Sequence, residues 1–135
     1  PIKSSAASDV YKRQVPGAED QLWMMMGDFN ARSRVDNAVY GYPEDDTRLL
    51  VHDYILQNTP YADVIAERYP GEFKTTIHGQ ARIDFVYCTR PLCDRITHAE
   101  VITDAFTDPV RDPDGLANFW HPSDHRPILV DFNME

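Results

Sequence analysis

The sequence predicts an α/β domain in which helices cover mixed sheets. A short apolar run comes first, two segments with helical features follow it, and several segments rich in β-branched and aromatic residues come last, joined by short connections. The chain has 135 residues, 42% of them hydrophobic, which suits a single globular domain. We therefore expect one layered domain rather than two domains or a repeat array.

The N-terminal stretch is expected to be foreign to this fold. Ser4 to Gln14 reads SSAASDVYKRQ, which matches the translation of a sequencing-library adapter. A stretch of that origin carries no information about the fold. We expect residues 1–14 to be disordered and residues 15–135 to form the domain, with the authentic protein extending upstream of Val15.

The first strand is expected over residues 22–26. This run, LWMMM, is apolar throughout and ends at a glycine, which is typical of a strand buried on both faces, with its methionines filling the core. A helix is expected from Asp46 or Thr47 to about Asn58, because its apolar residues follow a helical period and Pro60 ends it.

The second half of the chain reads mainly as strands. A short helix over 61–69 comes before them. The strands are expected over 73–77, 83–88, 96–102 and 127–132. The string PLCDRI, from Pro91, is interpreted as a hairpin turn, and 103–123 as a long loop. We expect His52 at the surface of the first helix. Cys88 and Cys93 are expected to be unpaired thiols, with a short-loop disulfide left open.

Three polar clusters lie at the ends of predicted strands, where ligands commonly bind. They are GDFN at 27–30, RID at 82–84 and SDH at 123–125. In an extended segment Asp28 and Asn30 share one face, while Phe29 points into the core. Each cluster alone has an ordinary interpretation: a capped turn, a surface aspartate or a polar loop.

Together the clusters supply the groups that phosphoester hydrolysis needs. A carboxylate can orient or deprotonate water, and an amide can donate to a phosphoryl oxygen. A carboxylate–histidine pair fixes the imidazole tautomer for acid–base or electrostatic work. A further carboxylate can hold a hard cation such as Mg²⁺.

The strings GDFN, RIDFVY and SDHRPI resemble the three C-terminal signature blocks of the endonuclease/exonuclease/phosphatase superfamily, which has the deoxyribonuclease-I-like fold. The resemblance covers 23–131. It implies the C-terminal half of a four-layer α/β/β/α sandwich and a hydrolase of phosphoester bonds that depends on Mg²⁺ or Mn²⁺. The family's metal-binding glutamate has no counterpart before Asp28, so the resemblance also implies that the 135-residue chain alone is inactive.

The resemblance assigns a role to each matching residue. Asp28 would position and activate the attacking water, and Asn30 would stabilise charge on the phosphate. Asp84 would hydrogen-bond and orient His125, which would contact the scissile phosphate or act as the base. Asp124 would bind or orient the metal.

Three further residues are candidates for substrate binding. Arg32 follows GDFN closely and can meet a phosphate, although a surface salt bridge is equally plausible. Asn118 and Trp120 precede SDH and can line the pocket mouth or anchor the loop by packing.

The substrate class stays open. The net charge of −9 argues against broad electrostatic binding of nucleic acid, and no apolar run is long enough to span a membrane. The alternatives are a catalytically inactive binding module on the same fold and an inositol-polyphosphate-type phosphatase, whose signature PLCDRI matches in part. Neither the oligomeric state nor the cellular location is indicated.

Overall fold

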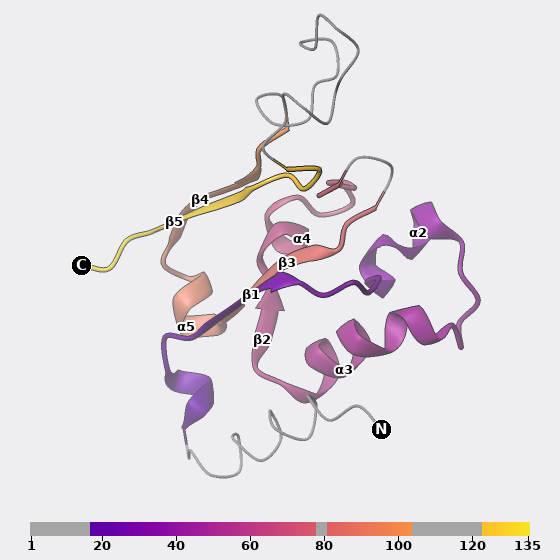
Figure 1. Ribbon diagram of the computed structural model, residues 1–135. Helices are drawn as coiled ribbons and strands as arrows, with labels where there is room; N and C mark the ends of the chain where they lie inside the picture. The colour runs from indigo at the N-terminus through magenta and orange to yellow at the C-terminus, as the bar shows by residue number, and fades with distance from the viewer. Residues whose placement is uncertain (1–16, 78–80, 104–122) are drawn as a thin grey trace, which may run out of the picture.

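The computed structural model describes residues 17–77, 81–103 and 123–135, which form an α/β fold with two small sheets (Figure 1). The strands are β1 (Met24–Asp28), β2 (Tyr61–Asp63), β3 (Asp84–Thr89), β4 (Ile96–Val101) and β5 (Ile128–Phe132). The α-helices are α2 (Asn37–Tyr40), α3 (Leu50–Asn58), α4 (Val64–Arg68) and α5 (Arg90–Cys93), with short 3₁₀ turns at Ala18–Asp20, Arg34–Asp36 and Thr47–Leu49. The expected disorder of residues 1–14 lies outside the described residues.

β3 is the central strand of the larger sheet. The strand order is β1-β3-β2, while β4 and β5 pair in a separate two-stranded sheet. All of these pairs are antiparallel, so the expectation of mixed sheets is wrong for the described strands. β1 and β2 run in the same direction, but no parallel pair forms because β3 lies between them.

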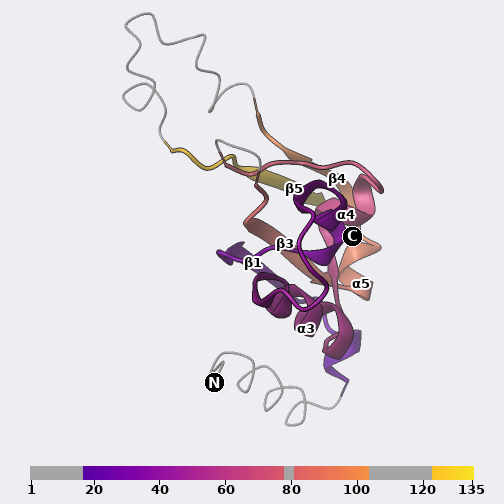
Figure 2. The ribbon, with the colours of Figure 1, turned by 90° about the vertical axis from the view of Figure 1, so that its right-hand side faces the viewer.

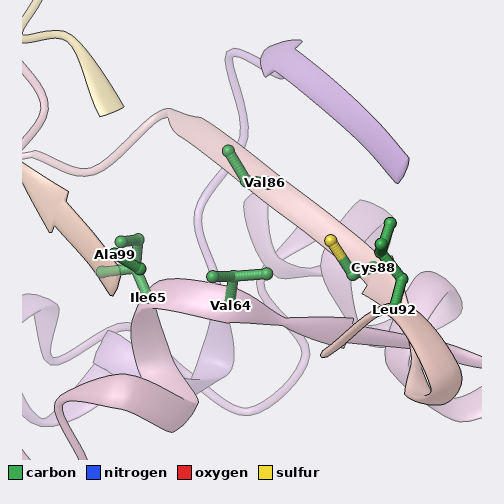
Figure 3. Packing of buried hydrophobic residues seen from close by; sticks show 6 residues of the cluster. All are labelled: Val64, Ile65, Val86, Cys88, Leu92 and Ala99. Atoms are coloured by element: carbon green, nitrogen blue, oxygen red, sulfur yellow. The ribbon is translucent and has the colours of Figure 1, made fainter. Parts of the chain in front are cut away.

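The two faces of β3 face two different cores. Phe85 and Tyr87 pack with Ile55 of α3 on one face. Val86 and Cys88 point to the other face, where α4, α5 and β4 supply the rest of the cluster (Figure 3). In both ribbon views α3 and the β4–β5 sheet lie on opposite sides of β3 (Figures 1 and 2). The predicted strand at 83–88 is therefore confirmed, because alternate residues bury on alternate faces.

β1 differs from its expectation. A strand buried on both faces was predicted, but Met24 is 45% exposed and Met26 is 61% exposed. β1 is an edge strand, and only the face that carries Met25 packs against the α3 core. The prediction that the methionines fill the core therefore holds for Met25 alone.

The expected helix after Asp46 is confirmed. The Asp46 side chain accepts the backbone N–H of Arg48 at 2.9 Å, and the helix ends at Asn58. Hydrogen bonds from the side chain and backbone of Arg48 lower the pKa of Asp46 to about 2. This cap satisfies one of the donors that a helix leaves unpaired at its N-terminus.

Two predicted segments are only partly correct. The helix expected over 61–69 is β2 followed by α4, because Asp63 caps α4 by accepting the backbone N–H of Ala66 at 3.1 Å. The strand expected over 73–77 forms only one bridge, between Ile77 and His125. The Thr76 side chain in this segment is buried and accepts the backbone N–H groups of Ile83 and Asp84.

The PLCDRI string is not a hairpin turn. Its first three residues lie in α5, Asp94 and Arg95 form a turn, and Ile96 begins β4, so the string connects β3 in one sheet to β4 in the other. Pro91 suits the first turn of a helix and Leu92 is buried in the core, so the chain crosses between sheets here. Cys88 and Cys93 are free, as expected. Among the described residues, no helix is long and apolar enough to cross a membrane.

The expectation that His52 lies at the surface is wrong. Its side chain is fully buried, and Nδ1 lies 2.6 Å from the hydroxyl of Tyr87. The ring centroid is 3.9 Å from that of Phe85. Burial in these surroundings lowers the pKa of His52 to about 4, because a charged imidazole would lose its hydration there.

His52 should make stability depend on pH. Its pKa is about 4 in the fold and about 6.5 when unfolded, so the unfolded state binds more protons between these values. Stability should be complete above the unfolded pKa and fall as pH drops through the window, by at most about 1.4 kcal/mol per pH unit. Urea unfolding at several pH values measures this. Between pH 6.5 and 4, the free energy of unfolding should fall less steeply in His52→Phe than in the unaltered chain.

His98→Gln is the matched control, because His98 lies on β4 and pairs with Glu100 at 3.3 Å within the described part of the chain. The account is contradicted if His52→Phe loses stability between pH 6.5 and 4 as steeply as the unaltered chain does.

Candidate functional site

The ends of β1 and β3 bring two carboxylates together. In the antiparallel register, Asp28 at the end of β1 lies opposite Asp84 at the start of β3. One step further, the backbone N–H of Phe29 donates to the carbonyl of Ile83 at 2.8 Å. The Phe29 ring packs edge-on against Phe85, which confirms its expected place in the core. The core thus fixes the chain beside Asp28, while Asp28 itself stays exposed.

Asn30 is folded back onto Asp28. Its backbone N–H donates to Asp28 Oδ1 at 2.8 Å, and its side-chain amide donates to Oδ2 at 3.2 Å. Asn30 has a left-handed backbone with φ 47°, a conformation that asparagine adopts more readily than most residues. Gly27, on the other side of Asp28, has φ 149°, where a side chain would be strained. The GDFN string therefore suits a turn that presents one carboxylate.

His125 completes the group from the segment that precedes β5. Its Nδ1 lies 3.0 Å from both carboxylate oxygens of Asp84, so the hydrogen bond that the resemblance implies is present. Its backbone N–H donates to the side chain of Ser123 at 3.0 Å. The hydrogen bond with Asp84, followed by the nearby charges of Asp84, Asp124 and Asp28, raises the pKa of His125 above its ordinary value.

These side chains can hold a cation. One ligand atom each from Asp28, Asp84 and His125 lies within 4.8 Å of the others. Two carboxylates suit Mg²⁺ or Mn²⁺, and the imidazole suits Mn²⁺ better than Mg²⁺. Asp124, the predicted metal ligand, is exposed and lies outside this group among the described residues. Its role as a ligand stays a prediction.

A hollow of about 330 Å³ lies beside the group. Asp84 and His125 form part of its wall, and Met26, Val86 and Ile128 form an apolar part. The exposed side of β1 therefore faces the same space as the carboxylate–histidine pair.

Of the three predicted substrate contacts, only Arg32 lies among the described residues. The Arg32 guanidinium lies 5.7 Å from the ring centroid of Tyr40, and its Nε has no hydrogen-bond partner among the described residues. Its neighbour Arg34 pairs with Asp53 at 2.8 Å. Asn118 and Trp120 lie outside the described residues.

Sequence reasoning missed the residue that supports this end of β3. Arg82 is 1% exposed, and its guanidinium pairs with Asp36 at 2.8 Å and with Asp63 at 2.8 Å. Its backbone N–H also donates to the hydroxyl of Tyr40 at 2.9 Å. A signal was available, because Asp63 interrupts the run Tyr61–Ile65, and a charge among apolar residues needs a buried partner.

No protein-family model matches this chain, and a search of curated proteins finds no match. The chemistry of this chain is indicated by the three-residue group and by the resemblance of the strand-end motifs.

The Asp84 contact should set the pKa of His125. We expect Asp84→Asn to lower that pKa toward the value of an ordinary histidine, because the hydrogen bond to the carboxylate is the largest cause of the shift. Asp124→Asn should lower it less, since Asp124 acts only through its charge. NMR titration of the His125 ring protons measures both. Equal effects of the two variants would contradict the assigned hydrogen bond.

Proposed function

We propose that this site belongs to a metal-dependent hydrolase of phosphoester bonds. The observation that carries the proposal is the placement of Asp28 directly across from Asp84, with His125 held on Asp84 at 3.0 Å. Like charges directly opposite in a sheet destabilise it, so a structure retains such a pair where a cation or a reaction uses it. The order of the three motifs along the chain supports the same class.

Each residue can act through contacts already formed. Asp28, whose carboxylate is held by Asn30, would take a proton from the attacking water. The side-chain amide of Asn30 carries a second hydrogen that can be donated to a phosphoryl oxygen. Asp84 accepts the Nδ1–H of His125, which leaves Nε2 to meet the substrate phosphate.

A divalent cation bound by the carboxylates would offset the negative charge of the phosphate. Asp28 and Asp84 are the residues that would hold it, because their oxygens lie within the same 4.8 Å group. His125 would remain on Asp84 as the group that contacts the phosphate. Asp124 would assist from the neighbouring loop position.

The finer fold proposal is a four-layer α/β/β/α sandwich with this chain as its C-terminal half. The exposed faces of Met24 and Met26 support it, because apolar side chains in a row on an edge strand are typical of a packing surface. The resemblance places a further glutamate ligand in the other half.

The test uses the longer protein that the resemblance implies, in which this chain would be the C-terminal half. We expect it to hydrolyse a generic phosphodiester with Mg²⁺ or Mn²⁺ and to stop when the cation is chelated. Asp28→Asn or His125→Ala should each lower kcat by about 10²- to 10⁴-fold, because each removes a group that acts on a proton or on developing charge. Circular dichroism should show that both variants remain folded.

His98→Ala is the matched histidine control, since His98 pairs with Glu100 on β4 and makes no contact with the proposed group. It should retain full activity. Activity that persists in chelator, or in His125→Ala, would rule the proposal out. No hydrolysis at all by the longer protein would favour a binding module. Residues 15–135 alone should show no such hydrolysis. If this fragment hydrolyses the substrate and Asp28→Asn abolishes that activity, the assignment of a glutamate ligand to the other half is contradicted.

A further inference from the structure

Thr76 supplies hydrogen bonds to the backbone at Asp84, on the side of β3 where no described strand does so. β2 pairs with β3 only along Tyr87–Thr89, so it leaves the first residues of β3 without a strand partner on that side. The hydroxyl of Thr76 accepts the backbone N–H groups of Ile83 at 3.0 Å and of Asp84 at 3.1 Å. Thr76 is fully buried, so water cannot supply these bonds in its place.

The backbone of the same residue holds the histidine side of the site. The carbonyl of Thr76 accepts the backbone N–H of Arg126 at 2.7 Å, directly after His125. The next residue, Ile77, forms the bridge to His125. The Arg126 guanidinium donates to the carbonyl of Thr75 at 3.2 Å. Residues 75–77 therefore contact both partners of the Asp84–His125 pair from one short segment.

We propose that Thr76 is a positioning residue that sets the backbone of Asp84 against that of His125. The proposal rests on the proposed function, because it matters for catalysis only if the Asp84–His125 pair acts on a substrate. Thr76 itself would touch neither substrate nor metal. Its hydroxyl fixes one side of the pair and its carbonyl fixes the other.

The two hydrogen bonds that the Thr76 hydroxyl accepts distinguish a positioning role from a role in packing the core alone. Valine has nearly the same shape as threonine but cannot accept a hydrogen bond, so Thr76→Val would leave the N–H groups of Ile83 and Asp84 buried and unpaired. The backbone would have to shift to satisfy them. A misplacement of about 1 Å in a site of this kind can cost about 100-fold in rate. Serine keeps the hydroxyl and loses only a methyl group.

The experiment compares Thr76→Val with Thr76→Ser in two readouts. In the 135-residue chain, amide hydrogen exchange by NMR should show the Ile83 and Asp84 amides protected in the unaltered protein and in Thr76→Ser, and exposed in Thr76→Val. The Arg126 amide is the internal control, because its acceptor is the Thr76 backbone. In the longer protein, kcat should fall about 10- to 100-fold in Thr76→Val, with KM little changed, and recover in Thr76→Ser.

Each outcome decides the proposal. It is overturned if Thr76→Val keeps both the amide protection and the kcat of Thr76→Ser. If Thr76→Val does not fold, the unaltered chain decides alone: rapid exchange of the Ile83 and Asp84 amides would overturn the assigned bonds, and slow exchange together with an active Thr76→Ser variant supports them. If the longer protein hydrolyses no phosphoester while the amide pattern is as expected, the proposed function fails but the contacts of Thr76 stand.

Discussion

The candidate site depends on the antiparallel pairing of β1 with β3 in a register that sets Asp28 opposite Asp84. Two unit charges about 4 Å apart repel by roughly 1 kcal/mol in water and by roughly 4 kcal/mol near a protein surface. Native domains are stable by only about 5–15 kcal/mol, so this repulsion is a substantial cost. His125 offsets part of it, because the hydrogen bond with Asp84 favours the charged imidazole. A bound cation would offset the rest.

Buried polar contacts of Arg82 and Thr76 support this register. Arg82 joins three separate parts of the chain through Asp36 and Asp63, and removal of one partner from such a buried group commonly costs about 3–5 kcal/mol. Thr76 completes the hydrogen bonds of β3 where its neighbouring strand ends. Asp28, Asp84 and His125 therefore lie beside buried ion pairs and hydrogen bonds, and the chemistry proposed for them requires that geometry to persist when a charged substrate arrives.

Local signals predicted much of this arrangement. The β3 strand, the capped helix α3 and the strands β4 and β5 follow from periodicity, capping residues and proline. The meeting of Asp28, Asp84 and His125 followed from motif order and strand ends. The burial of His52, the exposure of Met26 and the contacts of Thr76 were not predictable in this way. They depend on which elements lie next to one another in the fold. The residues adjacent in sequence to a histidine on a helix, or to a methionine in an apolar run, do not indicate its tertiary neighbours.

The central claim is that Asp28 and Asp84 hold one divalent cation beside His125. Substoichiometric Mn²⁺ added to the ¹⁵N-labelled chain tests it directly, because the paramagnetic ion broadens the amide signals nearest to it, even when binding is weak. We predict that the signals of these three residues broaden first and that Asp28→Asn removes this preference. The account is contradicted if broadening spreads equally over exposed acidic positions such as Glu44, Asp45 and Asp131.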